Sequence, residues 1–333
     1  SDLKLTCIAL DGYGDKSSGC HLYIDKGNIT ELNKYEVNQS LGLFYGIITE
    51  YLGFKRAEGE FKVMGMAAYG SPKYDLSGFF DEKFQVDNIT NYINDAAKIT
   101  SLCEPYYMEN KLKRVIKELP QRRLPGEEFT QEHFDLAASV QDYFQRSYRD
   151  LIKGAVQEKG NSLVSLSGGC ALNCLANSEL LNAKWLDDFY IQPAASDRGL
   201  SLGAAYLTCH DSGIETKPCS DMYLGAKYQP DQIKQTLETA GVRYKESQDI
   251  YQEASQMISE GFIVGWFQGK SEFGPRALGS RSILADATKK GIKDRINSRI
   301  KFREAYRPFA PIVSSNFAKS MGLEKKLEHM TVA

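Results

Sequence analysis

The segment from residue 161 to residue 209 constrains the fold most, because it repeats one plan twice. "SLVSL" (162–166) is predicted as a buried strand, "SGG" as a tight turn and "CALNCLANSELL" (170–181) as a helix. "DFYIQPAASDRGLSLGAAYLTC" (188–209) has the same order of strand, small-residue loop and helix. Two such units predict a parallel sheet whose carboxyl edge carries backbone N–H groups and positive helix ends.

The N-terminal part predicts a three-stranded antiparallel unit followed by helices. Residues 4–11, 20–25 and 29–37 have strand patterning and are separated by Gly- and Asp-containing turns. Residues 40–54 have apolar side chains at helical spacing, with Ser40 as a possible N-cap. We expect an insertion with short helices over 75–130 and one long helix from about 131 to 159, where the apolar period continues throughout.

A boundary is predicted near residues 210–222, which gives two domains, 1–215 and 216–333. The second domain is predicted to contain helices over 230–240 and 248–259 and a strand over 262–268. A strand over 282–286 and a helix over 288–298 are predicted after these. The fold class is therefore α/β.

Net charge limits the kinds of partner. The chain has 41 Lys and Arg against 43 Asp and Glu, a net charge of −2, so nothing global indicates binding to nucleic acid or to an anionic membrane. No apolar run reaches membrane-spanning length, and no signal peptide is visible. Seven cysteines at irregular spacing are typical of reduced thiols, so we expect a cytoplasmic protein. Any anion site must be local.

The strongest local cationic feature is "SEFGPRALGSRSILAD" (271–286) with "KFREAYRPFAP" (301–311). Its cations stand beside glycine and proline rather than on a solvated helical face. Arginine forks suit phosphate and carboxylate groups. A cluster of interdomain salt bridges explains the same pattern equally well. The candidate residues are Arg276, Arg281, Lys301, Arg303 and Arg307.

Two strand ends and one glycine-rich segment are further candidates. "SGGCALN" (167–173) is a cradle for nucleotide phosphate or sugar, or a plain tight turn, and it matches neither GxxxxGK[ST] nor GxGxxG. Asp197 has two interpretations, a ligand of a metal or a ribose and the N-cap of a helix. Asp11 is a metal or nucleotide ligand, or part of an Asp-Gly turn. Lys62 in "KVMGMAAYG" also has two interpretations, a contact to a phosphate and an ordinary solvated lysine.

Taken together, these segments resemble one family, the carbamoyltransferases of the nodulation-protein NodU and antibiotic-carbamoylating CmcH/TobZ type. The resemblance covers most of the chain and is carried by ordered motifs, of which "FGPRALGSRSILAD" is the most specific. The others are "LDGYGD", "SLGLFYGIITEYLGF", "KVMGMAAYG", "LSGGCALN", "SDRGLSLGAA" and "REAYRPFAP". It implies the C-terminal half of an actin/sugar-kinase-like ATPase domain, followed by part of a smaller α/β carbamoyltransferase domain.

The resemblance also implies a reaction and its residues. Carbamoyl phosphate and ATP give a carbamoyl-adenylate, and the carbamoyl group passes to a hydroxyl of a small acceptor such as a sugar, an antibiotic precursor or a nodulation factor. The five cations match the carbamoyl phosphate site, and Gly168, Gly169 and Asn173 match the nucleotide turn, with Lys62 and Asp197 as further nucleotide contacts. Asp11 and Asp197 match two aspartates that hold a divalent metal, iron or magnesium.

The chain departs from this pattern in one respect. The family's HxxxH metal element is absent, so we expect an excised core with an incomplete metal site, and a possible homodimer through exposed surface. Two alternatives stay open: a relative of the tRNA-threonylcarbamoyl enzymes, and a non-catalytic module that binds a nucleotide or metabolite.

Overall fold

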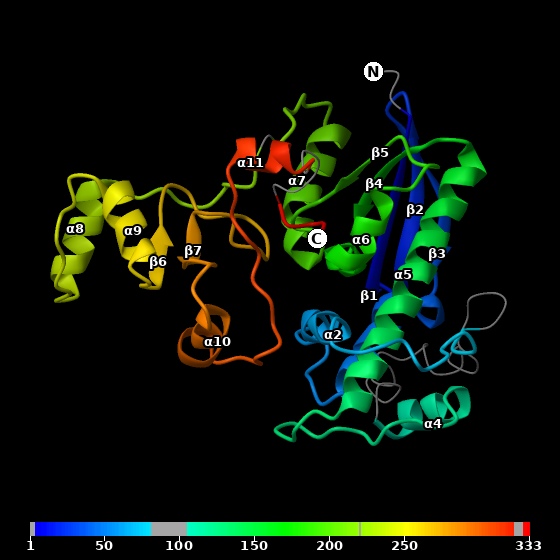
Figure 1. The fold of residues 1–333 in the computed structure, drawn as a ribbon. Helices are drawn as coiled ribbons and strands as arrows, with labels where there is room; N and C mark the ends of the chain where they lie inside the picture. Colours follow the sequence, from blue (N-terminus) through cyan, green and yellow to red (C-terminus); the bar gives the residue numbers. More distant parts are fainter. Residues whose placement is uncertain (1–3, 81–104, 220, 323–328) are drawn as a thin grey trace. The chain divides into compact units, whose positions relative to one another are not determined.

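The computed structural model describes residues 4–80, 105–219, 221–322 and 329–333. The chain forms two compact units (Figure 1). Unit 1 consists of Ser1–Leu200 and Thr331–Ala333, and unit 2 consists of Ser201–Met330. Division by compactness thus falls between Leu200 and Ser201. The domain boundary expected between residues 215 and 216 stays a prediction.

Unit 1 contains a five-stranded mixed sheet with the order β3-β2-β1-β4-β5. β1 pairs antiparallel with β2 and parallel with β4, β2 pairs antiparallel with β3, and β4 pairs parallel with β5. The predicted antiparallel unit and the predicted parallel pair are both confirmed, and they share one sheet. The strands are β1 (Lys4–Gly14), β2 (Ser17–Asp25), β3 (Asn28–Tyr35), β4 (Leu163–Ser167) and β5 (Asp188–Ile191).

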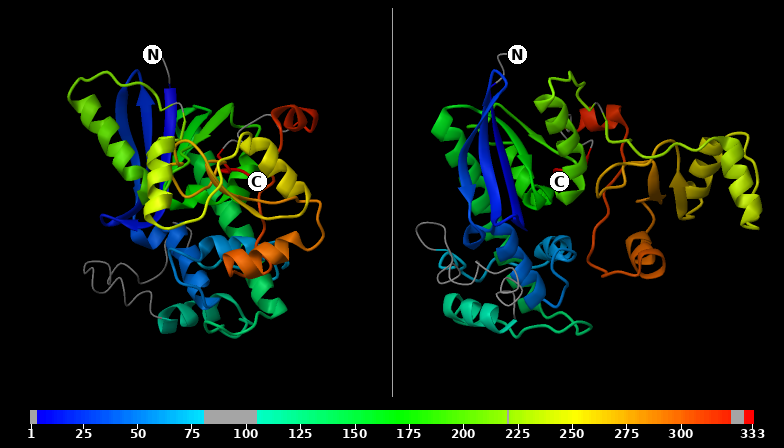
Figure 2. Two further views of the ribbon diagram at one scale, coloured as in Figure 1. Left: turned by 90° about the vertical axis from the view of Figure 1, so that its left-hand side faces the viewer. Right: turned by 180° about the vertical axis from the view of Figure 1, so that it is seen from behind.

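Helices pack against this sheet through an apolar core. α5 is the predicted long helix, and it contacts β1, α1, α2 and α6; Figure 2 shows it beside the sheet from two further directions. Phe44 of α1 and Leu136 and Phe144 of α5 are almost fully buried. α5 is followed by the C-cap residue Gly160, whose φ of 61° favours glycine. The helices are α1 (Leu41–Tyr51), α2 (Glu60–Ala67), α4 (Pro105–Val115), α5 (Gln131–Lys159) and α6 (Cys174–Leu180).

The structure corrects two expected boundaries in unit 1. The helix expected over 170–181 is a 3₁₀ turn at Gly169–Leu172 followed by α6, because the Asn173 side chain accepts from the Ala176 N–H and starts a new helix. The third strand ends at Tyr35, before a 3₁₀ turn at Val37–Gln39. α2 occupies part of the glycine-rich segment that contains Lys62. In the expected insertion, α4 confirms a short helix, and residues 81–104 lie outside the described residues.

Unit 2 contains short elements and a two-stranded antiparallel hairpin of β6 and β7, in which Val264 pairs with Leu284 and Phe267 with Arg281. The expected helices and strands are present, although the last helix is shorter than expected and continues as a π-helical turn at Asn297–Lys301. No helix within the described ranges is both long and apolar enough to cross a membrane. The elements are α7 (Leu200–Asp211), α8 (Pro230–Thr239), α9 (Ile250–Ser259), β6 (Val264–Phe267), β7 (Arg281–Leu284), α10 (Ile292–Ile296) and α11 (Ser315–Ser320).

The last residues of the chain belong to unit 1. The Asn177 side-chain amide of α6 donates to the Thr331 carbonyl at 2.7 Å, and the Ser178 hydroxyl bonds to both the carbonyl and the N–H of Ala333. Val332 is buried. The chain therefore leaves unit 1 at Leu200 and returns to it at Thr331.

Candidate functional site

The glycine turn after β4 meets Asp11 of β1. One carboxylate oxygen of Asp11 accepts the Gly169 N–H at 2.7 Å, and the other accepts the Gly12 N–H at 2.7 Å. Asp11 and Gly169 are 158 positions apart. The parallel pairing of β1 with β4 brings their carboxyl ends together, which explains the meeting. The structure thus joins a residue expected to bind metal to a residue expected to bind nucleotide.

Gly168 shows why this turn needs glycine. Its φ is 81° and its ψ is 165°, a conformation that is essentially restricted to glycine. A Cβ atom at this position would lie 2.1 Å from the Leu10 carbonyl oxygen, which belongs to the neighbouring strand. The turn is therefore fitted closely against the backbone of β1.

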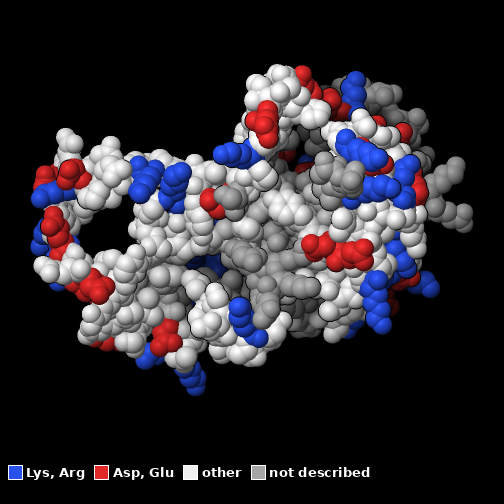
Figure 3. All heavy atoms as spheres, turned by 90° about the horizontal axis from the view of Figure 1, so that it is seen from above, with Lys and Arg blue, Asp and Glu red and all other residues white. Residues whose placement is uncertain are grey.

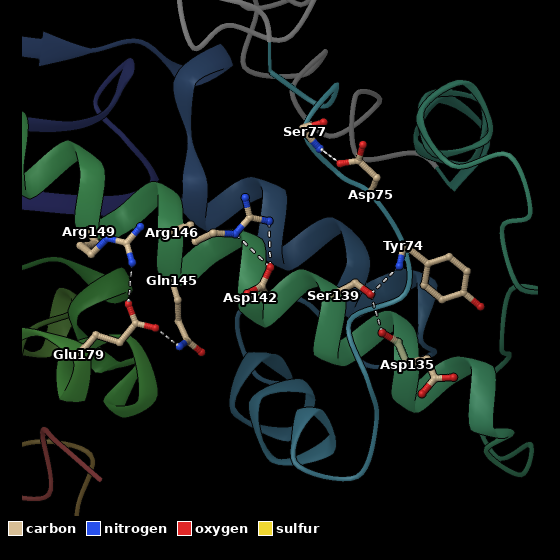
Figure 4. A network of polar contacts seen from close by, with 10 residues as sticks. All are labelled: Tyr74, Asp75, Ser77, Asp135, Ser139, Asp142, Gln145, Arg146, Arg149 and Glu179. Carbon is tan, nitrogen blue, oxygen red and sulfur yellow. Dashed lines mark hydrogen bonds and ion pairs between the residues drawn. The ribbon is translucent and has the colours of Figure 1, made fainter.

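Asn173 belongs to a buried amide pair behind the turn. Its Nδ2 donates to Gln141 Oε1 at 3.0 Å, and its Oδ1 accepts from Gln141 Nε2 at 2.9 Å. The Tyr45 hydroxyl donates to the same Gln141 oxygen at 2.8 Å. Gln141 also donates to Gln145, and Figure 4 shows how Gln145 and Arg149 of α5 both contact Glu179. The side chain of Asn173 thus fixes the start of α6 from inside the protein.

Asp197 and Lys62 lie in separate settings. Asp197 is exposed in the first turn of a 3₁₀ helix at Asp197–Gly199. Lys62 is half-buried on α2, with its ammonium 5.1 Å from the centre of the Phe54 ring. Among the described residues, no three His, Cys, Asp or Glu side chains gather as a metal site requires. With both Asp11 oxygens also bonded to backbone N–H groups, these residues do not make up a full set of metal ligands, and we assign no step to a metal.

The first cationic segment of unit 2 is folded around Glu272. One oxygen of this buried carboxylate accepts the N–H groups of Leu278 at 2.6 Å, Ser280 at 2.8 Å and Arg281 at 3.4 Å. The other oxygen lies 3.0 Å from the Arg281 Nε. Arg281 also donates to the carbonyls of Glu272 and Gly274. Most of the polar capacity of Arg281 is therefore used to hold the segment together.

The second cationic segment is folded around Asn297. Its Nδ2 donates to the carbonyls of Ala305 and Arg307, and its Oδ1 accepts from Arg303 Nε at 2.7 Å. The Arg303 guanidinium lies 4.3 Å from the centre of the Phe309 ring. Burial lowers the pKa of Arg303, and the charge of Arg307 lowers it further. Arg307 in turn lies 3.7 Å from the Glu304 carboxylate.

Arg276 and Lys301 differ from the other three cations. Neither side chain forms a hydrogen bond or an ion pair with any residue that the structure describes. Arg276 is half-buried and Lys301 is exposed. On the face drawn in Figure 3, Lys and Arg are interspersed with Asp and Glu, in agreement with the net charge of −2. The five predicted cations therefore divide into three that are engaged within the protein and two that are available.

Comparison with known proteins agrees with the family resemblance that the sequence motifs carry. A family model described as the carbamoyltransferase N-terminus matches residues 3–206, more than half of the chain, and one described as the carbamoyltransferase C-terminus matches residues 255–333. The chain belongs to the carbamoyltransferase family. The resemblance stated from the motifs is confirmed, and the fold class with it.

Three named relatives are longer than this chain, and each is matched by it over part of its length. Nodulation protein NolNO of Sinorhizobium fredii is 35% identical over 92% of this chain and 44% of its own length. Nodulation protein NolO of Bradyrhizobium diazoefficiens is 35% identical over 91% of this chain and 54% of its own length. The 3'-hydroxymethylcephem-O-carbamoyltransferase of Streptomyces clavuligerus is 34% identical over 44% of this chain and 27% of its length. The chain spans about half the length of the two nodulation proteins.

Sequence reasoning about this carbamoyltransferase chain missed Glu272, Asn297 and Gln141. Each is buried and polar, and each gathers groups that lie apart in the sequence. For Glu272 a signal was present, because it is an isolated acidic residue in a segment of Gly, Pro and Arg. For Asn297 and Gln141, which lie inside ordinary helical patterns, the sequence offered no such signal.

Proposed function

We propose that this chain binds carbamoyl phosphate through Arg276 and takes part in O-carbamoyl transfer to a small hydroxyl compound. The observation that carries the proposal is the division among the cations. Arg276 has no partner within the described residues, yet it lies in a segment whose backbone is held by Glu272 and Arg281. A half-buried guanidinium without a counter-charge on a fixed loop is suited to a small dianion.

The chemistry of the dianion fits this arrangement. A planar guanidinium fork donates two parallel N–H bonds to a phosphoryl group, which fixes the orientation of the carbamoyl carbon. Positive charge at the phosphate also stabilises it as a leaving group. Lys301 supplies a second, exposed ammonium in the same unit, while Arg281, Arg303 and Arg307 support the two loops.

ATP is the proposed co-substrate, and carbamoyl-adenylate the proposed activated intermediate, formed from carbamoyl phosphate, water and ATP with release of phosphate and pyrophosphate. Support comes from the turn at Gly168 and Gly169, which follows a parallel strand and precedes a helix, as nucleotide-binding turns in such folds do. Asn173, Lys62 and Asp197 stay predicted nucleotide contacts.

The acceptor is proposed as a class only. The name of the Streptomyces clavuligerus relative states O-carbamoylation of a hydroxymethyl group on a cephem, and two other relatives are named as nodulation proteins. A small hydroxyl compound is consistent with these names. Cytoplasmic location and a homodimer stay predictions.

Isothermal titration of the chain with carbamoyl phosphate tests the proposal. Arg276→Ala is expected to weaken binding at least about tenfold, because a charge-assisted bidentate contact is lost. The matched control is Arg299→Ala, an exposed arginine of the same unit, which should bind as the unsubstituted chain does. Equal affinity of the Arg276→Ala variant and the control variant would contradict the proposal.

A further inference from the structure

The segment that carries Arg276 is short of regular structure but rich in fixed contacts. At its start, the Gly225 N–H donates to the Ser271 carbonyl at 3.0 Å and the Phe273 N–H to the Met222 carbonyl at 2.6 Å. At its end, the Gln268 N–H donates to the Ser280 carbonyl at 2.9 Å. These bonds fix the two ends of the segment, and the part between Gly274 and Gly279 has to be held in another way.

Glu272 supplies that hold from inside the loop. Its side chain is fully buried, and it accepts three backbone N–H groups that lie six to nine residues further along the chain. Burial by itself opposes the charged form of the carboxyl group, but the N–H bonds of Leu278, Ser280 and Arg281 outweigh it and lower the pKa of Glu272. The carboxylate is thus ionised at neutral pH, with three backbone N–H groups on one oxygen and the Arg281 guanidinium beside the other.

The backbone conformation shows what these bonds achieve. Gly274 has a φ of 114° and Gly279 a φ of 105°, and a positive φ of this size favours glycine at both positions. Between them stand Pro275, which has no N–H to donate, and Arg276. The loop closes around the carboxylate and leaves Arg276 at its turn without an internal partner.

We propose that Glu272 is a positioning residue, whose buried carboxylate fixes the loop from 272 to 281 and thereby presents Arg276 to the anion. The proposal rests on the proposed function of Arg276 in binding carbamoyl phosphate. Glu272 itself touches no substrate. Its partners are the backbone of its own loop and Arg281, and through them it determines where the Arg276 guanidinium lies.

The sign of the expected effect separates positioning from electrostatics. Removing a carboxylate near an anion site removes a repulsive charge, so electrostatics alone predicts tighter binding of carbamoyl phosphate. Positioning predicts weaker binding, because a displaced arginine loses its bidentate geometry. A purely structural role predicts lower thermal stability without a specific loss of affinity in the protein that remains folded.

The experiment compares the 333-residue chain with Glu272→Ala, Glu272→Gln and the control Glu246→Ala, whose carboxylate is 77% exposed in the same unit. Titration with carbamoyl phosphate gives the affinity, and thermal unfolding shows that each variant is folded. Amide hydrogen exchange over residues 277–281 reports the loop directly and needs no ligand. Glu272→Gln keeps the acceptor oxygen and the size of the side chain, so it stays informative where Glu272→Ala fails to fold.

We expect an ordered result. Affinity should fall about threefold in Glu272→Gln and at least about tenfold in Glu272→Ala, with faster exchange over 277–281 and unchanged affinity in Glu246→Ala. Unchanged or tighter binding by folded Glu272 variants would overturn the proposal while leaving the function of Arg276 standing. Unchanged exchange over 277–281 in these variants would also overturn it. Absence of binding by the unsubstituted chain, with exchange that responds to Glu272, would instead overturn the proposed function.

Discussion

Among the described residues, each unit has one buried acidic side chain, and the two carboxylates have different partners. Asp135 of unit 1 accepts the Ser71 N–H at 2.9 Å and Gln131 Nε2 at 3.1 Å, and it forms an ion pair with Lys73. Glu272 of unit 2 accepts N–H groups of its own loop and pairs with Arg281. Asp135 therefore joins α5 to a segment some 62 to 64 positions away, whereas Glu272 closes a loop of ten residues.

The surroundings of the two carboxylates explain this difference. Asp135 stands beside Leu136 in a helix packed into an apolar core, so its bonds link parts whose places the core already fixes. Figure 4 shows Asp135 and Ser139 on α5 beside Tyr74, whose N–H donates to the Ser139 hydroxyl. In unit 2 the loops around Glu272 and Asn297 have few buried apolar side chains, so polar groups determine their shape. Unit 1 should respond most to lost packing, and unit 2 to lost hydrogen bonds.

The largest effect is expected from Leu136→Ala, which opens a cavity in the core of unit 1. The free energy of unfolding of unit 1 should fall by about 2–5 kcal/mol, because Leu136 is fully buried. Fluorescence in urea can follow each unit separately, since Trp185 lies in unit 1 and Trp266 in unit 2 and each can be replaced by Phe. The control, Leu124→Ala at a position that is 53% exposed, should cost less than about 1 kcal/mol. Equal costs at the two positions would contradict the assigned core.

Gly168→Ala should come next in size. The substitution forces a φ of 81° on alanine and brings its Cβ against the Leu10 carbonyl, so we expect a loss of about 1–3 kcal/mol or more in unit 1. The control is Gly154→Ala in the middle of α5, where no atom lies within 4 Å of the added Cβ. It should stabilise the unit by about 0.5–1 kcal/mol. A loss of the same size in both variants would show that the turn has no special requirement for glycine.

Acid titration should affect both carboxylates in the same direction. Their pKa values are lowered in the folded protein, so their contribution to stability is present above the ordinary values of 3.8 for Asp135 and 4.5 for Glu272 and is lost as the pH falls below them. Unfolding at pH 7 and at successively lower pH values measures this slope in each unit. Asp135→Asn should flatten it only in the Trp185 signal, and Glu272→Gln only in the Trp266 signal. A change in the signal of the other unit would contradict the conclusion that each carboxylate stabilises only its own unit.

The smallest effect is expected from the exposed ion pair of Arg146 with Asp142 on α5 (Figure 4). The two side chains are about half exposed and four residues apart, at 2.8 Å. Arg146→Ala should change the free energy of unfolding of unit 1 by less than about 0.5 kcal/mol. A cost above that of Gly168→Ala would mean that surface charges, rather than packing, stabilise this unit.

The same contrast explains what the sequence could predict. The sheet and the long helix were predictable because alternation in β1 and the helical period of α5 are local consequences of one buried face. The break at Asn173 was not, because it depends on a side-chain cap that competes with a continuing helix. Among the site residues, the distinction between Arg276 and Arg281 was out of reach. It depends on which cation Glu272 pairs with, and that is fixed only when the loop closes.

The return of the chain to unit 1 at Thr331 has a topological consequence. Unit 2 is inserted between two parts of unit 1. It is attached at Leu200 and again where Asn177 and Ser178 bind residues 331–333. Attachment at both ends limits how far the two ends of unit 2 can separate. It also keeps the local concentration of unit 2 near unit 1 high after one connection is cut. A cut in either connection should therefore leave unit 2 attached to unit 1 through the other connection.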